Sequence, residues 1–259
     1  MSTSPQPSAL SPPLRIWYGG TFDPVHNGHL TIACAARDAL DCAIRLMPAA
    51  DPPHRAPPGA QAMHRAAMVE LAIAGERGLR IDRRELTRSG RSYSIDTLRD
   101  LRDVYGLDAP LALLIGADSL VGLPTWKDWR VLFELAHFVV ADRLGSNIDA
   151  GGADLEQALA GRWVSAPPAL RESPAGCVLR LQQPLHSGSA TDVRSRIASG
   201  EPWRPLVPAA VADYIEHHGL YGTPLDKAGH DKAGYDKAGY DKDGHDKDGH
   251  DKDDPVRPL

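Results

Sequence analysis

Lysine is almost missing from the first 225 residues of this 259-residue chain, where Lys127 is the only one. If this part of the chain binds a phosphate group, arginine, histidine or backbone N–H groups must supply the contacts. Arg55, Arg143 and Arg194 are the natural candidates. Residues 226–259 carry ten Asp against six Lys and one Arg, or −3 of the formal −5, which leaves about −2 for the body. A nearly neutral body argues against broad nucleic-acid binding.

Long apolar runs are also absent. No stretch of 18 apolar residues occurs, which excludes an ordinary membrane-spanning helix. The serine- and proline-rich start has neither the basic region nor the apolar centre of a secretory signal, so we expect a cytoplasmic protein. Cys34, Cys42 and Cys177 form no C-x-x-C pair and lie among apolar residues, which predicts reduced, buried thiols without a redox role.

The most informative segment is the run Gly19–His29, GGTFDPVHNGH. A short apolar strand at Ile16–Tyr18 leads into two glycines, which let the backbone turn sharply and approach a ligand closely. A helix is expected to begin near Asn27 or Gly28 and to run to Leu40, so that its unpaired N–H groups and positive dipole end face the turn. The sequence therefore predicts an anion site at this helix start.

His26 and His29 are three residues apart, so both imidazoles can lie side by side above the helix start and bind one phosphate chain. Taken alone, such a pair is more often two surface histidines beside a turn. The preceding strand, the paired glycines and the following amphipathic stretch favour phosphate binding here. A zinc site fits less well. Zinc needs a third ligand at a recognisable distance in the sequence, and two zinc-binding histidines on one helix are usually four residues apart.

A second motif, SATDVR, lies at Ser189–Arg194. It puts the hydroxyls of Ser189 and Thr191 at a helix start beside free N–H groups, with Arg194 on the same face. A guanidinium offers forked, permanently charged donors that suit a triphosphate. Alone, the motif would indicate an ordinary capped helix with a surface arginine; with the first motif, it predicts the second half of a triphosphate site.

Apolar runs alternate with amphipathic stretches along residues 15–222, which predicts parallel strands joined by helices. We expect strands at 16–18, 43–47, 79–83, 111–115, 136–141 and 178–181, and helices up to 40 and at 60–74, 94–105 (capped by Ser94), 129–134, 190–199 and 208–217, with a loop and a short helix in 145–161. The expected fold class is α/β, with a single doubly wound, Rossmann-like parallel sheet covered by helices on both faces. Gly116 and Asp118 follow a buried strand and so lie where such sheets hold ligands.

Two segments are expected to lie outside this domain. Residues 1–14 form a proline-rich leader, and residues 223–259 form a tail of five-residue repeats such as Asp-Lys-Asp-Gly-His. The apolar content of both is too low for a folded core, so both are predicted to be disordered. The tail could bind divalent metal loosely, but a solubilising or incidental repeat expansion is favoured. Its removal is predicted to leave activity intact.

Both motifs resemble a known family. Gly19–His29 matches in full the G-G-T/S-F-D-P-x-H-x-G-H fingerprint of the HxGH nucleotidyltransferases, and Ser189–Arg194 matches their S-x-T-x-x-R motif. That superfamily acts on nicotinate mononucleotide, phosphopantetheine or cytidylyl acceptors, so the acceptor stays open at this point. Three further segments resemble bacterial nicotinate-nucleotide adenylyltransferases: PPHR at 52–55, RSYS at 91–94, and GADSL with PTWKDW at 116–120 and 124–129.

The likeness runs from Ile16 to Tyr221 and departs from the family at two places. Ala49–Asp51 stand where the family often has an asparagine before Pro-Pro-His, and Gly188 replaces the usual isoleucine. The resemblance implies transfer of the adenylyl group of ATP to nicotinate mononucleotide in NAD biosynthesis. It also implies Mg²⁺ held mostly by phosphates and water, and ATP and nicotinate mononucleotide as small-molecule partners, with no nucleic acid or membrane.

By the same resemblance His26, His29 and Arg194 are catalytic. The implied ATP site consists of Gly19, Gly20, Thr21, Phe22, His26, His29, Gly116, Asp118, Ser189, Thr191 and Arg194, and the implied acceptor site of His54, Arg55, Ser94, Ile95, Asp118, Trp126, Lys127 and Arg143.

A pyridine ring favours a flat aromatic partner, which Trp126 can supply. In the family, backbone N–H groups corresponding to Ser94, Ile95 and Lys127 bind the nicotinate carboxylate, which explains a preference for the acid over the amide. Each residue also has a structural alternative: Trp126 as core, Ser94 as a helix cap and Asp118 as a turn residue. Two other functions stay open, a related phosphopantetheine or cytidylyl transferase and a non-catalytic nucleotide sensor on the same fold.

Overall fold

The computed structural model describes residues 12–51, 59–88, 90–142, 151–184 and 188–224. Within these ranges seven parallel strands form one sheet in the order β3-β2-β1-β4-β5-β7-β6. The strands are β1 (Arg15–Gly20), β2 (Ile44–Pro48), β3 (Leu79–Ile81), β4 (Leu111–Gly116), β5 (His137–Ala141), β6 (Trp163–Val164) and β7 (Val178–Leu181). The chain moves outward from β1 to β3 and then continues on the other side of β1 with β4. The strand order therefore reverses between β1 and β4, which is where open α/β sheets bind ligands.

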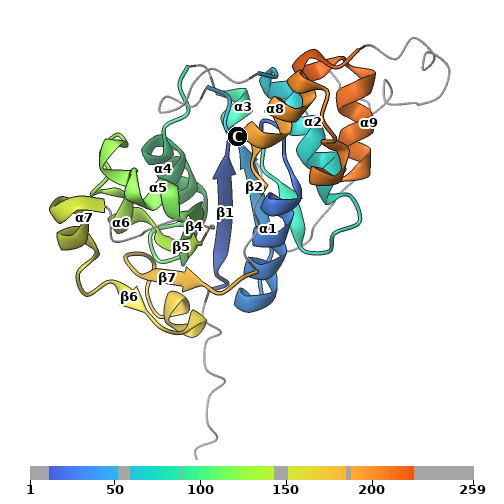
Figure 1. Ribbon diagram of the computed structural model, residues 1–259. Coiled ribbons are helices and arrows are strands. Elements are labelled where there is room, and N and C mark those ends of the chain that lie inside the picture. Colours follow the sequence, from blue (N-terminus) through green and yellow to red (C-terminus); the bar gives the residue numbers. More distant parts are fainter. Residues whose placement is uncertain (1–11, 52–58, 89, 143–150, 185–187, 225–259) are drawn as a thin grey trace, which may run out of the picture.

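Helices cover both faces of the sheet (Figure 1). One face carries α1 (Asn27–Leu40), α2 (Ala62–Ile73), α8 (Ala190–Ser199) and α9 (Ala209–His217); the other carries α4 (Ser94–Tyr105), α5 (Ala117–Val121), α6 (Leu132–Leu135) and α7 (Gly152–Leu159). In β1, Ile16 and Tyr18 enter the core of the first face and Trp17 enters that of the second, as expected for a strand covered on both sides. The doubly wound α/β fold predicted from the sequence is confirmed.

Shorter elements connect these layers: a one-turn helix α3 (Arg84–Thr87) and the 3₁₀ turns η1 (Leu123–Thr125), η3 (Pro167–Arg171), η4 (Arg204–Leu206) and η5 (Leu220–Gly222). No helix in the described part of the chain is long and apolar enough to cross a membrane.

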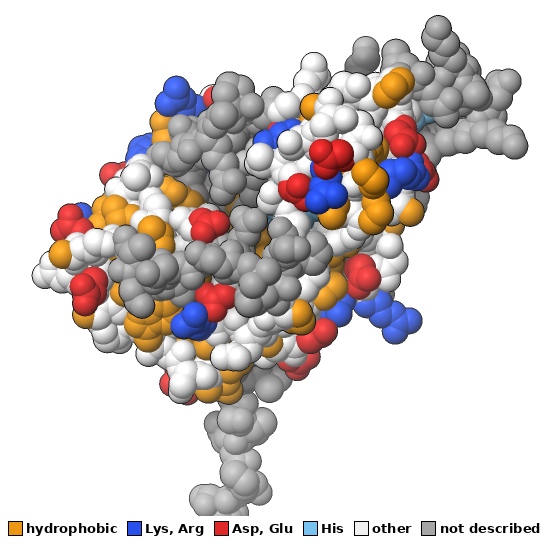
Figure 2. All heavy atoms as spheres, in the orientation of Figure 1, with side chains coloured by type: hydrophobic (Ala, Val, Ile, Leu, Met, Phe, Trp, Pro, Cys, Tyr) orange, Lys and Arg blue, Asp and Glu red, His pale blue; other side chains and the backbone are white. Residues whose placement is uncertain are grey.

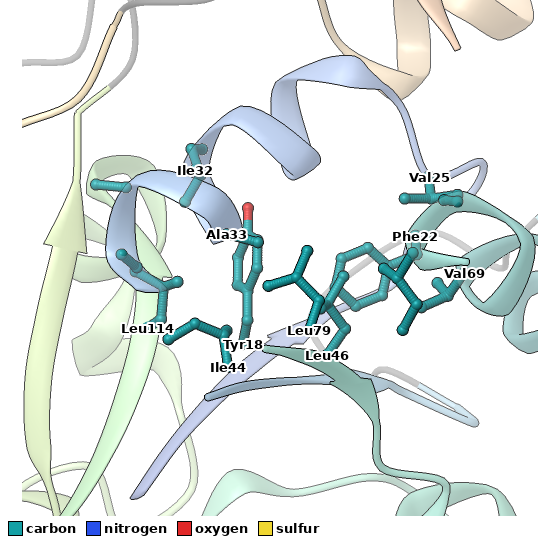
Figure 3. Packing of buried hydrophobic residues seen from close by; sticks show 14 of the residues in the cluster. Tyr18, Phe22, Val25, Ile32, Ala33, Ile44, Leu46, Val69, Leu79 and Leu114 are labelled. Atoms are coloured by element: carbon teal, nitrogen blue, oxygen red, sulfur yellow. The ribbon is translucent and has the colours of Figure 1, made fainter. Parts of the chain in front are cut away.

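Packing of α1 on the sheet fixes the position of its first turn. Ile32, Ala33 and Leu40 follow the helical period and are buried, and Ile32 and Ala33 face Tyr18 and Leu114 of the sheet (Figure 3). Each buried isoleucine or leucine contributes about 1.5–3 kcal/mol relative to an exposed one. The N-terminus of α1 is thus held at the carboxyl end of β1, as the glycine-rich turn required.

The structure differs from the sequence prediction at several elements. The edge strand β6 and the one-turn helix α3 were not predicted, because segments of two and four residues are too short to show a period. Helix α4 has Tyr93 as its cap residue, with no side-chain capping bond, so Ser94 is its first residue and the predicted cap was wrong. Thr223, beyond the predicted domain boundary, is buried, and its Oγ1 donates to the carbonyl of Leu220 at 2.9 Å.

The cysteines are free thiols but only partly buried, so the predicted full burial was wrong. Cys34 lies beside the apolar stripe of α1, where its Sγ is 3.7 Å from Glu76 Oε2. Cys42 follows the same helix, and burial raises the pKa of its thiol to about 11.

Candidate active site

Two cavities open at the carboxyl ends of β1 and β4. The histidine cavity, about 540 Å³, is lined by His26, His29 and Arg194, and the tryptophan cavity, about 380 Å³, is lined by Ser94 and Trp126. Both volumes lie in the range of small-molecule sites. The two cavities share a wall formed by Gly19, Gly20, Thr21, Asp118 and Ser119. Two ligands bound on either side of this wall would therefore meet at the point where the strand order reverses.

The two histidines form a reciprocal cap at the start of α1. His26 Nδ1 accepts the N–H of Gly28 at 3.1 Å, and His29 Nδ1 accepts the N–H of His26 at 3.2 Å. Their ring centroids are 3.8 Å apart, so the predicted side-by-side placement is confirmed. Because each Nδ1 accepts a hydrogen bond, the hydrogen of each neutral ring is on Nε2. Both rings line the cavity as Nε2–H donors.

Aromatic rings fix the orientation of His29. Its ring centroid lies 6.0 Å from that of Tyr18 and 4.9 Å from that of Phe22. A Cβ atom added to Gly20 would lie 3.0 Å from the Phe22 ring, a tight contact that would push on this ring, so glycine suits this position. Phe22 has a φ of +50°, a conformation that is uncommon for a bulky residue and is typical of tight functional turns.

The second motif brings Arg194 to the same cavity. Ser189 caps α8, and its Oγ accepts the N–H of Asp192 at 3.0 Å. Arg194 Nη1 donates to the carbonyl of Asp23 at 2.5 Å and lies 3.6 Å from Asp23 Oδ2, while Nη2 is 3.4 Å from Thr191 Oγ1. The arginine therefore contacts the loop between β1 and α1 from a helix that begins more than 160 residues later.

Every residue that the sequence assigned to ATP lines the histidine cavity: Gly19, Gly20, Thr21, Phe22, His26, His29, Gly116, Asp118, Ser189, Thr191 and Arg194. Two of them have features that bear on ligand binding. A Cβ atom on Gly116 would meet no atom within 4 Å, so its absence keeps the floor of the cavity open. Thr21 Oγ1 is buried and has no hydrogen-bond partner among the described residues, which is rare unless a ligand or water completes it.

The predicted acceptor residues are only partly brought together. Ser94, Asp118, Trp126 and Lys127 line the tryptophan cavity, whereas the Ile95 side chain is fully buried in the core and does not line it. His54, Arg55 and Arg143 lie outside the described residues. Trp126 is half-buried at the margin of the core, so it packs on the core and lines the cavity at once.

Lys127 links the segment after η1 to the start of helix α4 by an ion pair and a cation–π contact. Its Nζ is 3.3 Å from Asp96 Oδ1 and 4.9 Å from the centroid of the Tyr93 ring. Tyr93, Ser94 and Trp126 all line the tryptophan cavity, so this contact joins two of its walls.

A polar group in the tryptophan cavity was missed from the sequence. Glu85 of α3 lines the cavity and is buried, and its Oε1 accepts the Thr97 hydroxyl at 2.8 Å. Burial raises the pKa of the Glu85 carboxyl, and hydrogen bonds from Thr97 and Ser92 oppose that rise. Ser92 Oγ in turn accepts the N–H of Ala50 at 3.1 Å. A four-residue helix has no recognisable period, so only its position after β3 could have pointed to Glu85.

A buried arginine, also missed, holds the segments that line both cavities. Arg65 of α2 is 1% exposed, and burial lowers the pKa of its guanidinium. Its nitrogens donate to four backbone carbonyls, those of Thr21 (2.6 Å), Ala49 (2.7 Å), Ala50 (2.9 Å) and Ala60 (3.1 Å). One side chain thereby joins the turn after β1, the end of β2 and the approach to α2.

The side chains coloured in Figure 2 are of mixed charge. On the face drawn in Figure 2, acidic and basic side chains are interspersed. Exposed ion pairs of the described residues include Arg204 with Asp213 at 2.5 Å. This face does not present the continuous basic surface that binds a nucleic-acid backbone.

Comparison with known proteins agrees with this geometry. A family model described as cytidylyltransferase-like matches residues 17–196. A Stenotrophomonas maltophilia (strain K279a) protein named "Probable nicotinate-nucleotide adenylyltransferase" is 58% identical over 217 residues, which cover 82% of this chain and 98% of the relative. A protein of the same name from Marinobacter nauticus (strain ATCC 700491 / DSM 11845 / VT8) is 42% identical over 210 residues, covering 81% and 97%.

The fold is also found among solved structures. The Plasmodium falciparum nicotinic acid mononucleotide adenylyltransferase complexed with NaAD superposes with a TM-score of 0.61 over 82% of this chain and 99% of that one, at 17% identity, a likeness of fold alone. The family model and the two relatives, which match this chain over most of its length, add the sequence likeness. The chain belongs to the nicotinate-nucleotide adenylyltransferase family of the cytidylyltransferase-like proteins.

Proposed function

We propose that the protein transfers the adenylyl group of ATP to nicotinate mononucleotide, forming nicotinate adenine dinucleotide and pyrophosphate in NAD biosynthesis. An oxygen of the acceptor 5′-phosphate attacks the α-phosphorus, one P–O bond forms, and the bond to the β-phosphate breaks. The observation that carries this proposal is the wall shared by the two cavities. A triphosphate held by the histidines and a ring held by Trp126 would have their reacting phosphates at that wall.

The histidine cavity supplies the groups that such a transfer needs, which are positioning and charge stabilisation. His26 and His29 donate from Nε2 to the non-bridging and leaving oxygens. Arg194 and the N-terminal N–H groups of α8 hold the β- and γ-phosphates. Asp118, which lines this cavity, accepts from ribose hydroxyls.

The tryptophan cavity supplies the acceptor contacts. Trp126 stacks on the pyridine ring. The first N–H groups of a helix have no partner within it, so those of Ser94 and Ile95 at the start of α4 can bind the nicotinate carboxylate, aided by the dipole of the helix. An amide in place of the carboxylate would lose this attraction, which supports a preference for the acid.

Magnesium is expected to accompany the triphosphate. Within the described ranges no group of three or more His, Cys, Asp or Glu side chains is arranged to hold a metal ion. The resemblance implies an ion held mainly by phosphate oxygens and water, and the carboxylates of Asp118 and Asp142, which line the histidine cavity, would lie near such an ion. Such an ion would neutralise part of the triphosphate charge.

Pyrophosphate release tests the proposal directly. A coupled assay compares ATP with nicotinate mononucleotide, ATP with nicotinamide mononucleotide, ATP with phosphopantetheine, and CTP with an alcohol phosphate. We expect the highest kcat/KM for ATP with nicotinate mononucleotide. A higher value for either of the last two pairs would assign a related transferase instead, and ATP binding without pyrophosphate release from any pair would indicate a nucleotide sensor.

Replacing Trp126 with alanine should weaken acceptor binding. Stacking of a base on an aromatic side chain contributes about 1–3 kcal/mol, so we expect the KM for nicotinate mononucleotide to rise about 5- to 150-fold while the KM for ATP changes little. Steady-state kinetics with each substrate varied in turn measures both. Trp163→Ala on the edge strand β6, where the side chain is 42% exposed, is the matched control and should leave both constants unchanged. An unchanged acceptor KM in Trp126→Ala would remove the stacking role.

Truncation after Pro224 is expected to leave kcat within about twofold. Thr223 is buried and must be retained, while the 217 residues matched by the Stenotrophomonas relative account for only 82% of the chain. The same pyrophosphate assay, with circular dichroism to compare folding, measures the effect. A correctly folded truncated protein with a more than tenfold lower kcat would assign the tail a part in turnover.

A further inference from the structure

Tyr221 connects the last described segment to the loop between β1 and α1. Its hydroxyl donates to Asp23 Oδ1 at 2.8 Å, across 198 positions of sequence. Tyr221 has φ +58° and ψ +18° inside η5, a left-handed conformation that costs a bulky residue about 1–3 kcal/mol. The surrounding contacts must therefore hold this residue in place.

Asp23 contacts both Tyr221 and Arg194, and so connects the tyrosine to the histidine cavity. Its side chain is 7% exposed, and Oδ2 and Oδ1 accept the N–H groups of Gly59 at 2.7 Å and Ala60 at 3.1 Å. The carbonyl of the same residue accepts from Arg194 Nη1 at 2.5 Å, and Oδ2 lies 3.6 Å from that nitrogen. The position of the Arg194 guanidinium thus depends on how Asp23 is held.

The ring of Tyr221 packs where these groups meet. A Cβ atom on Gly59 would lie 3.1 Å from the Tyr221 ring and 3.5 Å from Arg194 Cδ, so ring and arginine stem flank the same glycine. Gly59, Asp23 and Arg194 line the histidine cavity, whereas Tyr221 does not. Any effect of Tyr221 on a bound nucleotide must therefore pass through its neighbours.

We infer that Tyr221 is a positioning residue for adenylyl transfer, whose hydroxyl holds Asp23 so that Arg194 faces the triphosphate. This inference rests on the proposed function and deepens it, since it assigns a role in adenylyl transfer to Tyr221, a residue of η5 near the end of the described chain. Burial and the neighbouring Asp23 raise the pKa of the Tyr221 phenol, so the hydroxyl stays protonated and donates at any working pH.

Tyr221→Phe removes only the hydroxyl. A hydrogen bond to a charged group is lost, so we expect kcat to fall about tenfold, with the KM for nicotinate mononucleotide within about twofold of wild type. Tyr214→Phe of α9 is the matched control, because its hydroxyl lies 3.0 Å from His64 Nδ1, outside both cavities, and kcat should not change. A lower melting temperature for Tyr221→Phe with unchanged kcat would make the contact merely structural and overturn the inference.

A double-mutant cycle with Arg194→Ala tests whether the effect passes through the arginine. We expect the tenfold loss caused by Tyr221→Phe to shrink to less than twofold when Arg194 is already alanine. An equal loss in both backgrounds would overturn the inference. Asp23→Asn, taken through the same cycle, gives a second reading if Tyr221→Phe folds poorly, and we expect the same non-additivity.

Failure of the proposed function would look different. Wild-type protein that releases no pyrophosphate from ATP and nicotinate mononucleotide contradicts the proposed reaction and leaves the positioning role intact. The cycle is then measured as the Kd of α,β-methylene-ATP, where non-additive losses for Tyr221→Phe and Arg194→Ala support the inference and additive losses refute it.

Discussion

His29→Ala is expected to lower kcat about 10²- to 10³-fold and to change the Kd of ATP far less. Removal of one preorganised donor to a developing oxyanion has an effect of this size. His29 is suited to that role because its Nδ1 is occupied by the N–H of His26, its ring is held between Tyr18 and Phe22, and its Nε2 carries the hydrogen. Single-turnover kinetics and nucleotide binding, measured separately, distinguish the two effects.

His64→Ala provides the control for this prediction. His64 lies on α2 against Tyr214 and lines neither cavity, so its loss should leave kcat unchanged. His26 is less suitable as a first variant, because it caps α1 and its removal is expected to cost about 1 kcal/mol of stability. A rise in KM alone for His29→Ala would make His29 a binding residue without a special role in the transition state.

Arg65→Met is expected to destabilise the protein by about 3–5 kcal/mol. Removing one partner from a buried charged network leaves the other groups unsatisfied, and here four carbonyls and the nearby Asp23 depend on one guanidinium. Urea unfolding, followed by circular dichroism, measures the change as a lower midpoint with an unchanged slope. Because Arg65 holds the segments that line both cavities, the KM values of ATP and acceptor should rise together at temperatures where the variant is still folded.

Arg99→Met is the matched control for Arg65→Met. Its guanidinium is 53% exposed and lies 3.8 Å from Asp96 in an i,i+3 pair, so its loss should change stability by less than about 0.5 kcal/mol. If Arg65→Met lost less than about 1 kcal/mol, the loops would have to be held by other contacts.

The local parts of the site could be predicted from the sequence. The turn after β1, the start of α1 and the cap of α8 each depend on residues within a few positions of one another, and their spacing carries the geometry. The order of strands and helices followed from the alternation of apolar runs, which reflects burial on both sides of a parallel sheet.

The contacts between distant segments could not be predicted in the same way. Arg65, Asp23 and Glu85 are buried polar residues, each with at least one hydrogen-bond partner 12 or more positions away, and nothing in their immediate sequence marks them as buried. Ser94 was predicted as a cap because serine favours that position, yet the segment before α4 lines a cavity and Tyr93 takes the cap position instead. Tertiary packing overrides local preference at such places.

The bond from Tyr221 to Asp23 has a consequence for the newly made protein. The turn that contains His26 leaves the ribosome early. Arg194 and Tyr221, which both contact Asp23, follow only after most of the chain has been synthesised. A nascent polypeptide that already contains both imidazoles therefore still lacks Arg194, which we propose holds the triphosphate. We therefore expect chains that end before Tyr221 to turn over ATP more slowly than the complete body, because they lack the contact that holds Asp23.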